Sequence, residues 1–448
     1  MRNTNKSNFT VVVAICGICA LVGSALALPP TFTATVNSVI GSDTRAPIFP
    51  RAGGLAVADF NGDGLADVAL AGTSVGGVAV FLNNGTGGAA QTWFPAGRWP
   101  VALAPADFDG DGDIDLACAN RNEGGVAILA NDGAGRFTRA AFYATGTTPD
   151  AVVAFDMDKD GSIDLVVANR TGSTVVVLGN TGGALSVRQS VPLPNAVPNA
   201  SNVSCQPCSL AVADMNADAW PDVVVACAAD DTARILTSTG GTLALTHTLP
   251  AGPYPVSVSA ADFDRDSRMD LVVADADGVQ LTLLRADSLG GYQPQEISLV
   301  APPYATPVLQ DVLAVNIDGD FDVDLIAAGL IYTNKNGVFS IRGPSTLPYD
   351  AYARGQVAGD SGVFAAGVQA GTVQLTYFVA GPPSSTSTQA DITHDGAVNV
   401  FDLQILARSW NKSAGQQGFD PRADLDGNGT VNVFDLMILA ASFGQRVN

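Results

Sequence analysis

Short apolar runs separated by turns of Gly, Asn and Asp fill the chain from residue 53 to about residue 378. In the first copy, apolar runs at 55–60, 68–72, 78–84 and 91–94 surround one Asp-rich segment at 61–67. Runs this short, rich in Val, Ala and Leu and bounded by turn residues, are typical of strands rather than helices. We therefore predict an all-β fold for this region, with four strands in each copy.

The Asp-rich segments recur with a period close to 50 residues. They begin at Asp59, Asp107, Asp156, Asp214, Asp262 and Asn316. Four strands per period of this length predict a propeller blade, and blades stack around an axis because one blade cannot bury both of its faces. Residues 354–367 repeat the frame without the Asp-rich loop, and residues 372–378 add a further strand. The favoured fold is thus a seven-bladed β-propeller, with six and eight blades left open. The missing outer strand is expected from Thr31 to Val39, which would close the ring.

The two ends of the chain differ from the repeats. A basic start is followed by an apolar stretch, Phe9 to Leu26, and by the small-residue motif Ala25-Leu26-Ala27. This pattern predicts a secretory signal peptide at 1–27, with an uncleaved membrane anchor as the alternative. The propeller is expected at 28–380, and a Pro/Ser/Thr-rich linker at 381–389. In residues 390–448 the apolar period becomes helical. We expect a chain that is secreted or held at the cell surface, with no membrane span after cleavage.

The charge of the chain narrows its chemistry. The net charge is −21, and only two of the 43 acidic residues, Glu123 and Glu296, are Glu. Short Asp side chains suit tight turns and compact metal loops. Nucleic acid is not an expected partner, because phosphate contacts need clustered Lys and Arg. With only two His, a Ser-His-Asp triad or a His-rich zinc site is not expected either.

The complete propeller loops follow the pattern D-x-D-x-D-G-x-x-D. Side chains at positions 1, 3, 5 and 9 and a backbone carbonyl at position 7 can converge on one cation, and Ca²⁺ takes about six to eight oxygen ligands. Gly at position 6 permits the sharp turn. We predict calcium ligands in five loops: Asp59, Asn61, Asp63 and Asp67; Asp107, Asp109, Asp111 and Asp115; Asp156, Asp158, Asp160 and Asp164; Asp262, Asp264, Asp266 and Asp270; and Asn316, Asp318, Asp320 and Asp324.

The remaining loop, with Asp214, Asn216, Asp218 and Asp222, contains Ala219 and Pro221 and is expected to bind calcium weakly or not at all. Six in-phase loops flanked by strands resemble the FG-GAP/VCBS repeat family, which includes the propeller of integrin α subunits. The resemblance covers residues 53 to about 378. It implies calcium ions at the periphery of the blades that stabilise them and take no part in a reaction.

Two C-terminal loops follow a different template, with oxygens at positions 1, 3, 5, 9 and 12 and Gly at 6, as in an EF-hand. The expected ligands are Asp391, Asp395, Asn399 and Asp402 in the first loop, and Asp424, Asp426, Asn428, Asn432 and Asp435 in the second. Thr393 is a poor ligand at position 3, so the occupancy of the first loop stays open. Two loop–helix copies joined by a short connector resemble a dockerin domain.

That resemblance implies docking to a cohesin module, with partner choice helped by loop positions 10 and 11. In this chain the residues at these positions are Val400, Phe401, Val433 and Phe434. The alternative is that they pack the two helices together. Because the two pairs are identical, we hypothesise two equivalent binding orientations.

Four cysteines remain after the expected cleavage: Cys118, Cys205, Cys208 and Cys227. In an exported chain the motif Cys205-Gln-Pro-Cys208 favours a small local disulfide, with a redox or metal motif as the alternative. Cys118 and Cys227 lie on equivalent predicted strands of different blades and are expected to be buried thiols.

Three functions fit these observations. The favoured one is a non-catalytic binding or adhesion propeller displayed through its dockerin, with a carbohydrate or a surface protein as the propeller's partner. The second is a carbohydrate-active enzyme, either a polysaccharide lyase or a glycoside hydrolase, and the third is a purely structural repeat protein. We assign no catalytic residue, because paired-carboxylate catalysis needs acids that hold no metal. The inter-strand turns at 83–84, 120–122, 169–170 and 230–231 are expected to share one rim and to form a polar binding surface.

Overall fold

The structure is a computed structural model of the whole chain. It describes residues 32–35, 54–64, 67–73, 76–83, 89–196, 204–277, 280–298, 311–315, 322–327, 330–341, 351–354, 363–369 and 372–378, and in the C-terminal region 392–393, 400–410, 412, 418–423, 425, 431 and 439. The signal-peptide segment and most of the predicted C-terminal ligands lie outside these residues. Two compact units emerge, one containing 31–317 with 322–379 and the other containing 380–448.

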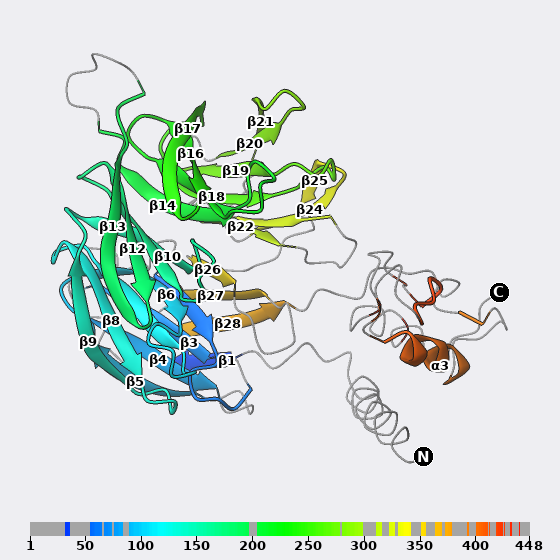
Figure 1. Ribbon diagram of the computed structural model, residues 1–448, viewed down its shortest axis with the longest axis horizontal. Helices are drawn as coiled ribbons and strands as arrows, with labels where there is room; N and C mark the ends of the chain where they lie inside the picture. Colours follow the sequence, from blue (N-terminus) through cyan, green and yellow to red (C-terminus); the bar gives the residue numbers. More distant parts are fainter. Residues whose placement is uncertain are drawn as a thin grey trace. The chain divides into compact units, whose positions relative to one another are not determined.

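The described strands form seven four-stranded sheets, here numbered 1 to 7 in chain order (Figure 1). Sheet 1 contains β2 (Leu55–Ala58), β3 (Asp67–Gly72), β4 (Gly77–Asn83) and β5 (Ala89–Pro95); sheet 2, β6 (Pro100–Ala106), β7 (Asp115–Asn120), β8 (Gly125–Asn131) and β9 (Phe137–Ala144); sheet 3, β10 (Pro149–Phe155), β11 (Asp164–Asn169), β12 (Thr174–Thr181) and β13 (Ala184–Pro192); sheet 4, β14 (Pro207–Ala213), β15 (Asp222–Cys227), β16 (Thr232–Thr239) and β17 (Thr242–Pro250). Sheet 5 contains β18 (Pro255–Ala261), β19 (Asp270–Asp275), β20 (Gln280–Ala286) and β21 (Tyr292–Ser298); sheet 6, β22 (Val312–Val315), β23 (Asp324–Ala327), β24 (Leu330–Lys335) and β25 (Val338–Ile341); sheet 7, β26 (Ala351–Arg354), β27 (Val363–Gln369), β28 (Thr372–Phe378) and β1 (Phe32–Thr35).

The sheets make a β-propeller. In each, the first strand of the repeat is the inner strand, and successive inner strands contact one another from β2 through β6, β10, β14, β18 and β22 to β26, which contacts β2 again. The outer strand of sheet 7 is β1, which pairs antiparallel with β28, Phe32 opposite Leu375. The strand expected from residues 31–39 therefore completes this sheet and covers the edge of β28.

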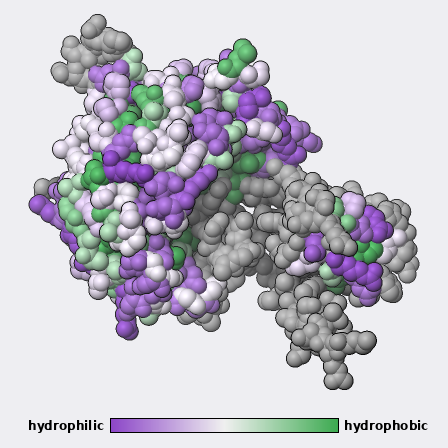
Figure 2. All heavy atoms as spheres, viewed as in Figure 1, coloured by the Kyte–Doolittle hydropathy of each residue, from purple (hydrophilic) through white to green (hydrophobic). Residues whose placement is uncertain are grey.

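The core lies between successive sheets, because neighbouring residues of a strand point to opposite faces. On β7, Leu116 and Cys118 pack with sheet 1, whereas Ala117 and Ala119 pack with sheet 3. Burial raises the pKa of the Cys118 thiol, so this cysteine is the inert buried thiol that the sequence predicted. The face of the propeller seen in Figure 2 is mostly hydrophilic, with scattered hydrophobic residues.

The C-terminal unit has its own small core. Helix α3 (Val400–Arg408) contributes Leu406, which packs with Ile392, Leu425 and Leu439. Asp402 is fully buried, and its Oδ1 accepts hydrogen bonds from the Thr393 backbone N–H (2.8 Å) and hydroxyl (2.9 Å). Thr393 is thus paired with the ligand expected at position 12 of its own loop. None of the described helices is both long and apolar enough to cross a bilayer.

Candidate functional site

The Asp-rich loops, numbered 1 to 6 with their sheets, connect the first and second strands of sheets 1 to 6. The carboxylate at position 1 holds the loop backbone: Gly62 and Gly64 donate their N–H groups to Asp59 at 2.8 and 2.7 Å, and Gly110 and Gly112 do the same to Asp107 at 2.7 and 3.0 Å. Both glycines of each loop have positive φ. Two left-handed residues, at positions 4 and 6, are therefore what the turn requires.

Loops 3 to 5 adopt the same backbone without this pair of glycines. Lys159, Ala217 and Arg265 have φ near 60° at position 4, and Ala219 and Ser267 have φ of 67° at position 6. A non-glycine residue in this region is strained and persists where surrounding bonds fix it. The position 1 carboxylate supplies these bonds, since Asp262 accepts from Ser267 N–H at 2.9 Å and Asp214 from Ala219 N–H at 2.8 Å.

The Asp at position 9 is buried at the start of the second strand and accepts two backbone hydrogen bonds. In loop 2, Asp115 accepts from Phe108 N–H at position 2 and from Asn131 N–H in β8, at 3.2 and 2.8 Å. The equivalent residues Asp67, Asp164, Asp222 and Asp270 repeat this pattern. Burial raises the pKa of Asp67 to about 7 and the pKa values of Asp115 and Asp270 to about 6. The position 9 residue therefore fastens the loop to the sheet in addition to its predicted role as a ligand.

Three loops bring carboxylate oxygens from positions 1, 3 and 9 within 4.8 Å of one another. These groups are Asp107, Asp109 and Asp115; Asp156, Asp158 and Asp164; and Asp262, Asp264 and Asp270. Asp158 Oδ1 and Asp264 Oδ1 are buried and accept no hydrogen bond from the described part of the chain. Buried carboxylate oxygens without a donor are costly unless a cation neutralises them. The residues of loops 2, 3 and 5 therefore fit a calcium ion.

Loops 1 and 4 differ at position 3. In both, an Asn amide donates to the position 5 carboxylate, Asn61 to Asp63 and Asn216 to Asp218, each at 3.0 Å. Neither loop gives a compact carboxylate group among the described residues. The predicted ligands Asn316, Asp318 and Asp320 of loop 6 lie outside the described residues, whereas Asp324 is fully buried and holds Asn334 N–H at 2.8 Å.

Arginines placed beside the loops were not recognised as partners from the sequence. Arg188 on β13 pairs with Asp158 at position 3 of loop 3, and Arg268 pairs with Asp266 at position 5 of loop 5. Arg265 reaches Asp322 of loop 6 at 2.8 Å. Such pairs offset part of the repulsion among the loop carboxylates, whereas no ion pair involves loop 2 within the described residues. Strand pairing across a sheet brings Arg188 to the loop, which spacing alone did not reveal.

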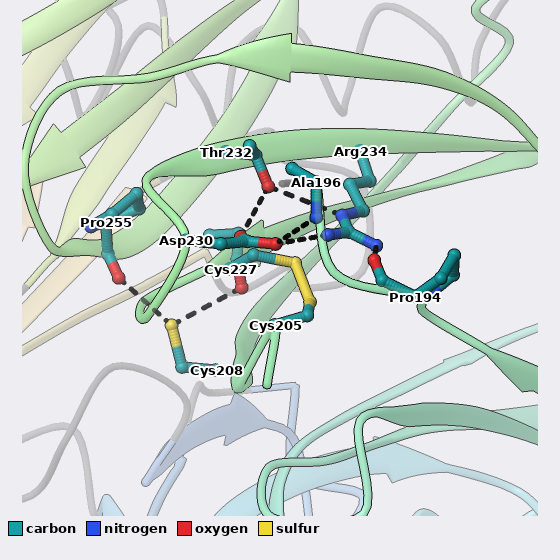
Figure 3. The surroundings of a disulfide bond; sticks show 10 residues. Pro194, Ala196, Cys205, Cys208, Cys227, Asp230, Thr232, Arg234 and Pro255 are labelled. Atoms are coloured by element: carbon teal, nitrogen blue, oxygen red, sulfur yellow. Dashed lines mark hydrogen bonds and ion pairs between the residues drawn. A yellow bond between two sulfur atoms is a disulfide. The ribbon is translucent and has the colours of Figure 1, made fainter. Parts of the chain in front are cut away.

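The expected Cys205–Cys208 disulfide is wrong, and so is the expected free thiol at Cys227. Cys205 is bonded to Cys227 at the end of β15, and Cys208 is a buried thiol that contacts the carbonyl oxygen of Pro255 at 3.2 Å (Figure 3). Cys208 lies within β14, where it faces sheet 5, so it points away from Cys205. Pro207 is the register partner of Cys227, which places Cys205 beside the end of β15.

The disulfide closes one end of an insertion between sheets 3 and 4. At the other end, the buried Arg234 pairs with Asp230 and donates to the Pro194 carbonyl, while Ala196 N–H donates to Asp230 at 3.2 Å (Figure 3). A buried guanidinium is tolerated here because its hydrogen bonds are satisfied. Both flanks of the insertion are therefore fixed to sheet 4.

At the other end of the inner strands, four residues share a strained backbone and form what we call the turn rim. Trp99, Thr148, Gln206 and Tyr254 all have φ between 51° and 62°, and each precedes the proline that opens an inner strand. The carbonyl oxygens of these four residues accept hydrogen bonds of 2.8 to 3.1 Å from backbone N–H groups in the turn that follows the second strand of the same sheet. A β-bulge follows each proline, in β6, β10, β14 and β18. Such repeated strain and bulging is common where side chains are aimed at a ligand.

The turn rim carries aromatic and polar groups linked across sheets. Arg170 donates to Asp150 (2.9 Å), to the Tyr254 hydroxyl (2.8 Å) and to Gln206 (3.2 Å), and thereby joins sheets 3, 4 and 5. Trp99 is 40% exposed and Tyr254 38% exposed. The inner strands line a cavity of about 510 Å³, and Ser257 and Asp311 are among its lining residues.

Comparison with known proteins agrees with this architecture. The FG-GAP-like repeat matches residues 59–118, 107–167, 156–225 and 214–273, and the dockerin type I domain matches residues 389–443. No curated protein matches the sequence. Chains from the crystal structures of BBS1N in complex with ARL6DN, soaked with lead and with mercury, superpose with TM-scores of 0.55 and 0.53; both are 14% identical and cover 80% of this chain and 99% of their own. At this identity the likeness concerns the fold alone.

The class defined by fold and loops is a β-propeller built from FG-GAP-like repeats. The chain is an FG-GAP repeat propeller that carries a dockerin type I domain at its C-terminus. Dockerin domains generally bind calcium and cohesin modules, and proteins that carry them are usually extracellular modules of cellulosome-like assemblies.

Proposed function

We propose that this chain is a secreted, calcium-stabilised, non-catalytic binding module that recognises carbohydrate at the turn rim and is held by its dockerin to a cohesin-bearing scaffold. The observation that carries the proposal is the repeated strained backbone at Trp99, Thr148, Gln206 and Tyr254. Strain at four equivalent positions is costly, and a binding surface that needs fixed side chains is a reason to retain it. The attached dockerin also supports a binding role, because a scaffold brings together modules that act on a common substrate or hold it.

Carbohydrate is the ligand class that these side chains fit. Sugar rings have apolar faces that stack on aromatic rings and hydroxyl edges that need planar hydrogen-bonding groups. Trp99 and Tyr254 offer partly exposed rings, and Arg170 and Gln206 offer the planar polar groups beside one of them. Arg170 already fixes Tyr254, so little rotational freedom would be lost on binding.

The test is affinity electrophoresis of the full chain in gels containing cellulose derivatives, xylan, mannan or pectin, in calcium and again in chelator. We expect retardation by at least one polysaccharide, with reducing-end analysis showing no products. Trp99→Ala and Tyr254→Ala should abolish the retardation, whereas Leu289→Ala, at a residue 94% exposed outside the rim, should not. No retardation by any polysaccharide would refute the carbohydrate assignment, and release of products would favour the enzyme.

Attachment is tested separately with a panel of cohesin modules in native electrophoresis. Because Val400-Phe401 and Val433-Phe434 are identical pairs, we expect the full chain to keep binding when either pair is changed to Ala-Ala and to lose it when both are. Loss of all binding from the Val433/Phe434 change alone would contradict two equivalent orientations.

A further inference from the structure

Three asparagines connect the metal loops of neighbouring sheets. The side-chain NH₂ of Asn131 donates to the carbonyl of Phe60 in loop 1 (2.8 Å) and to that of Ile114 in loop 2 (3.0 Å). Asn180 joins Phe108 of loop 2 to Ile163 of loop 3, at 2.9 and 3.1 Å. Asn334 joins Phe263 of loop 5 to Val323 of loop 6, at 2.8 and 3.0 Å. Each bond pair links position 2 of one loop to position 8 of the next.

The same asparagines are fixed by the loop of their own sheet. The backbone N–H of Asn180 donates to Asp164 at position 9 of loop 3, at 2.7 Å. Its side-chain oxygen accepts from Gly183 N–H (3.1 Å) in the turn after β12, and that turn packs on Asp109 of loop 2. Asn180 is buried, so it cannot exchange these bonds for water without opening the interface. A change in loop 3 therefore acts on the backbone at positions 2 and 3 of loop 2, directly after the position 1 ligand.

Loop 4 lacks this connection on both of its sides. The residues equivalent to the asparagines are Ser238 in β16 and Ala286 in β20, and they keep only the backbone bond to position 9, at 2.7 and 2.8 Å. The Ser238 hydroxyl is buried and has no partner in the described structure. Other bonds cross this junction: Gln189 pairs with the backbone of Leu243, and Lys159 donates to the Ala219 carbonyl.

We propose that Asn180 is a positioning residue that couples calcium binding between loops 2 and 3, and that Asn131 and Asn334 extend the same backbone link to loops 1 and 6, with an interruption at loop 4. The inference rests on the calcium assignment of the loops. Its physical basis is shared ordering: the first ion fixes the asparagine, and the next ion binds a loop whose backbone is already held. Loop 4, in which Ala219 and Pro221 depart from the complete loop pattern, is also the loop with no asparagine link on either side.

The test is hydrogen exchange read by mass spectrometry on the full chain across a calcium titration. Peptides covering loops 2, 3 and 5 report each loop separately. The variant Asn180→Ser gives sheet 3 the residue that sheet 4 has at the equivalent position. The calcium concentration that gives half-maximal protection should rise about fivefold in loop 2 and about fivefold in loop 3, as expected for the loss of one hydrogen-bonded link. Loop 5 should not change. The matched control Ser238→Ala should leave all three loops unchanged.

Each other outcome overturns the proposal. A shift in only one of loops 2 and 3 would mean that the loops fill independently. An equal shift in loop 5, or the same effect in Ser238→Ala, would indicate general destabilisation. If calcium gave no protection in the unaltered chain, both the coupling and the calcium assignment would be wrong. The carbohydrate proposal would stand, because it is tested separately by the binding of polysaccharide.

Discussion

Sheets 2 and 4 share a backbone frame and the Asp residues at positions 1 and 9 that fix it, but they differ at position 3 of the loop and at the end of the second strand. Both have buried Asp at position 9, Asp115 and Asp222, with two backbone hydrogen bonds each. At position 3, sheet 2 has Asp109 in a carboxylate group, whereas sheet 4 has Asn216. The frame therefore survives the change from Asp to Asn at position 3, because the carboxylates at positions 1 and 9 hold the backbone in both loops.

A second difference lies at the end of the second strand. In sheet 2, Asn120 donates to the Ala96 carbonyl at 2.9 Å, and Asn169 does the same to Thr145 at 3.0 Å in sheet 3. The equivalent residue of sheet 4 is Cys227, which is bonded to Cys205. In these three sheets one position thus fastens the connection that leads into the sheet, by an amide where the loop has a compact carboxylate group and by a disulfide where it does not.

Removing calcium should have the largest effect and should separate the two sheets. With calcium at 100 times the dissociation constant, each occupied site adds about 2.7 kcal/mol to the free energy of unfolding. We expect a chelator to lower the melting temperature markedly, with exchange protection lost at loop 2 and unchanged at loop 4. An unchanged melting temperature would argue against calcium altogether.

Loss of the disulfide should be next in size and should affect sheet 4 alone. Cys205→Ser with Cys227→Ser opens a loop between residues 22 apart, which costs about 3 kcal/mol. The matched change in sheet 2, Asn120→Ala, removes the hydrogen bond to the Ala96 carbonyl and two longer ones, to Glu123 and from Cys118, and should cost about 1 kcal/mol. Urea unfolding measures both, and equal losses would mean that the covalent link adds nothing beyond the amide.

Position 9 and position 3 should respond differently to calcium. In Asp222→Asn the side-chain NH₂ replaces one carboxylate oxygen, so one backbone N–H loses its acceptor. The free energy of unfolding should fall by about 1–3 kcal/mol, in calcium and in chelator alike. Asp109→Asn should lower stability only in calcium and should remove one ion from the stoichiometry measured by calorimetry. If Asp109→Asn were as costly in chelator, position 3 would belong to the frame as well.

The smallest effect concerns Asp275, the sheet 5 equivalent of Asn120 and Cys227. Burial raises the pKa of this carboxyl to about 7, so the folded chain keeps its proton to higher pH than the unfolded chain. The resulting stability is complete below about pH 4 and is lost as the pH rises through 7. Asp275→Asn, which cannot ionise, should therefore have a free energy of unfolding about 1–2 kcal/mol higher than that of the unaltered chain at pH 8, and nearly the same one at pH 4.

Measurements in chelator remove calcium's own pH dependence from this comparison. The exposed Asp277→Asn serves as the control and should change neither value. A pH-independent effect of Asp275→Asn would mean that its carboxyl is ionised in the fold.

Local periodicity was enough to predict the strands, the loops and the pairing of residues 32–35 with the last sheet, since these follow from spacing and from the need to cover edges. Contacts between repeats were not predictable in the same way. Asn180 carries no motif, and its role depends on the packing of two sheets. The Cys205–Cys208 expectation is wrong because strand β15 brings Cys227 beside Cys205, and the spacing within a short motif carries no information about a neighbouring strand.

The pairing of β1 with β28 has a consequence for the order of folding. Synthesis begins at the N-terminus, so residues 32–35 emerge first and have no partner until β28 has been made. Sheets 1 to 6 can form in sequence from local contacts, whereas sheet 7 must wait for both ends of the propeller, and contacts of such long sequence separation form slowly. The last sheet to close is thus the one directly followed by the dockerin region, and an assembly that captured the dockerin early would capture a ring that is still open.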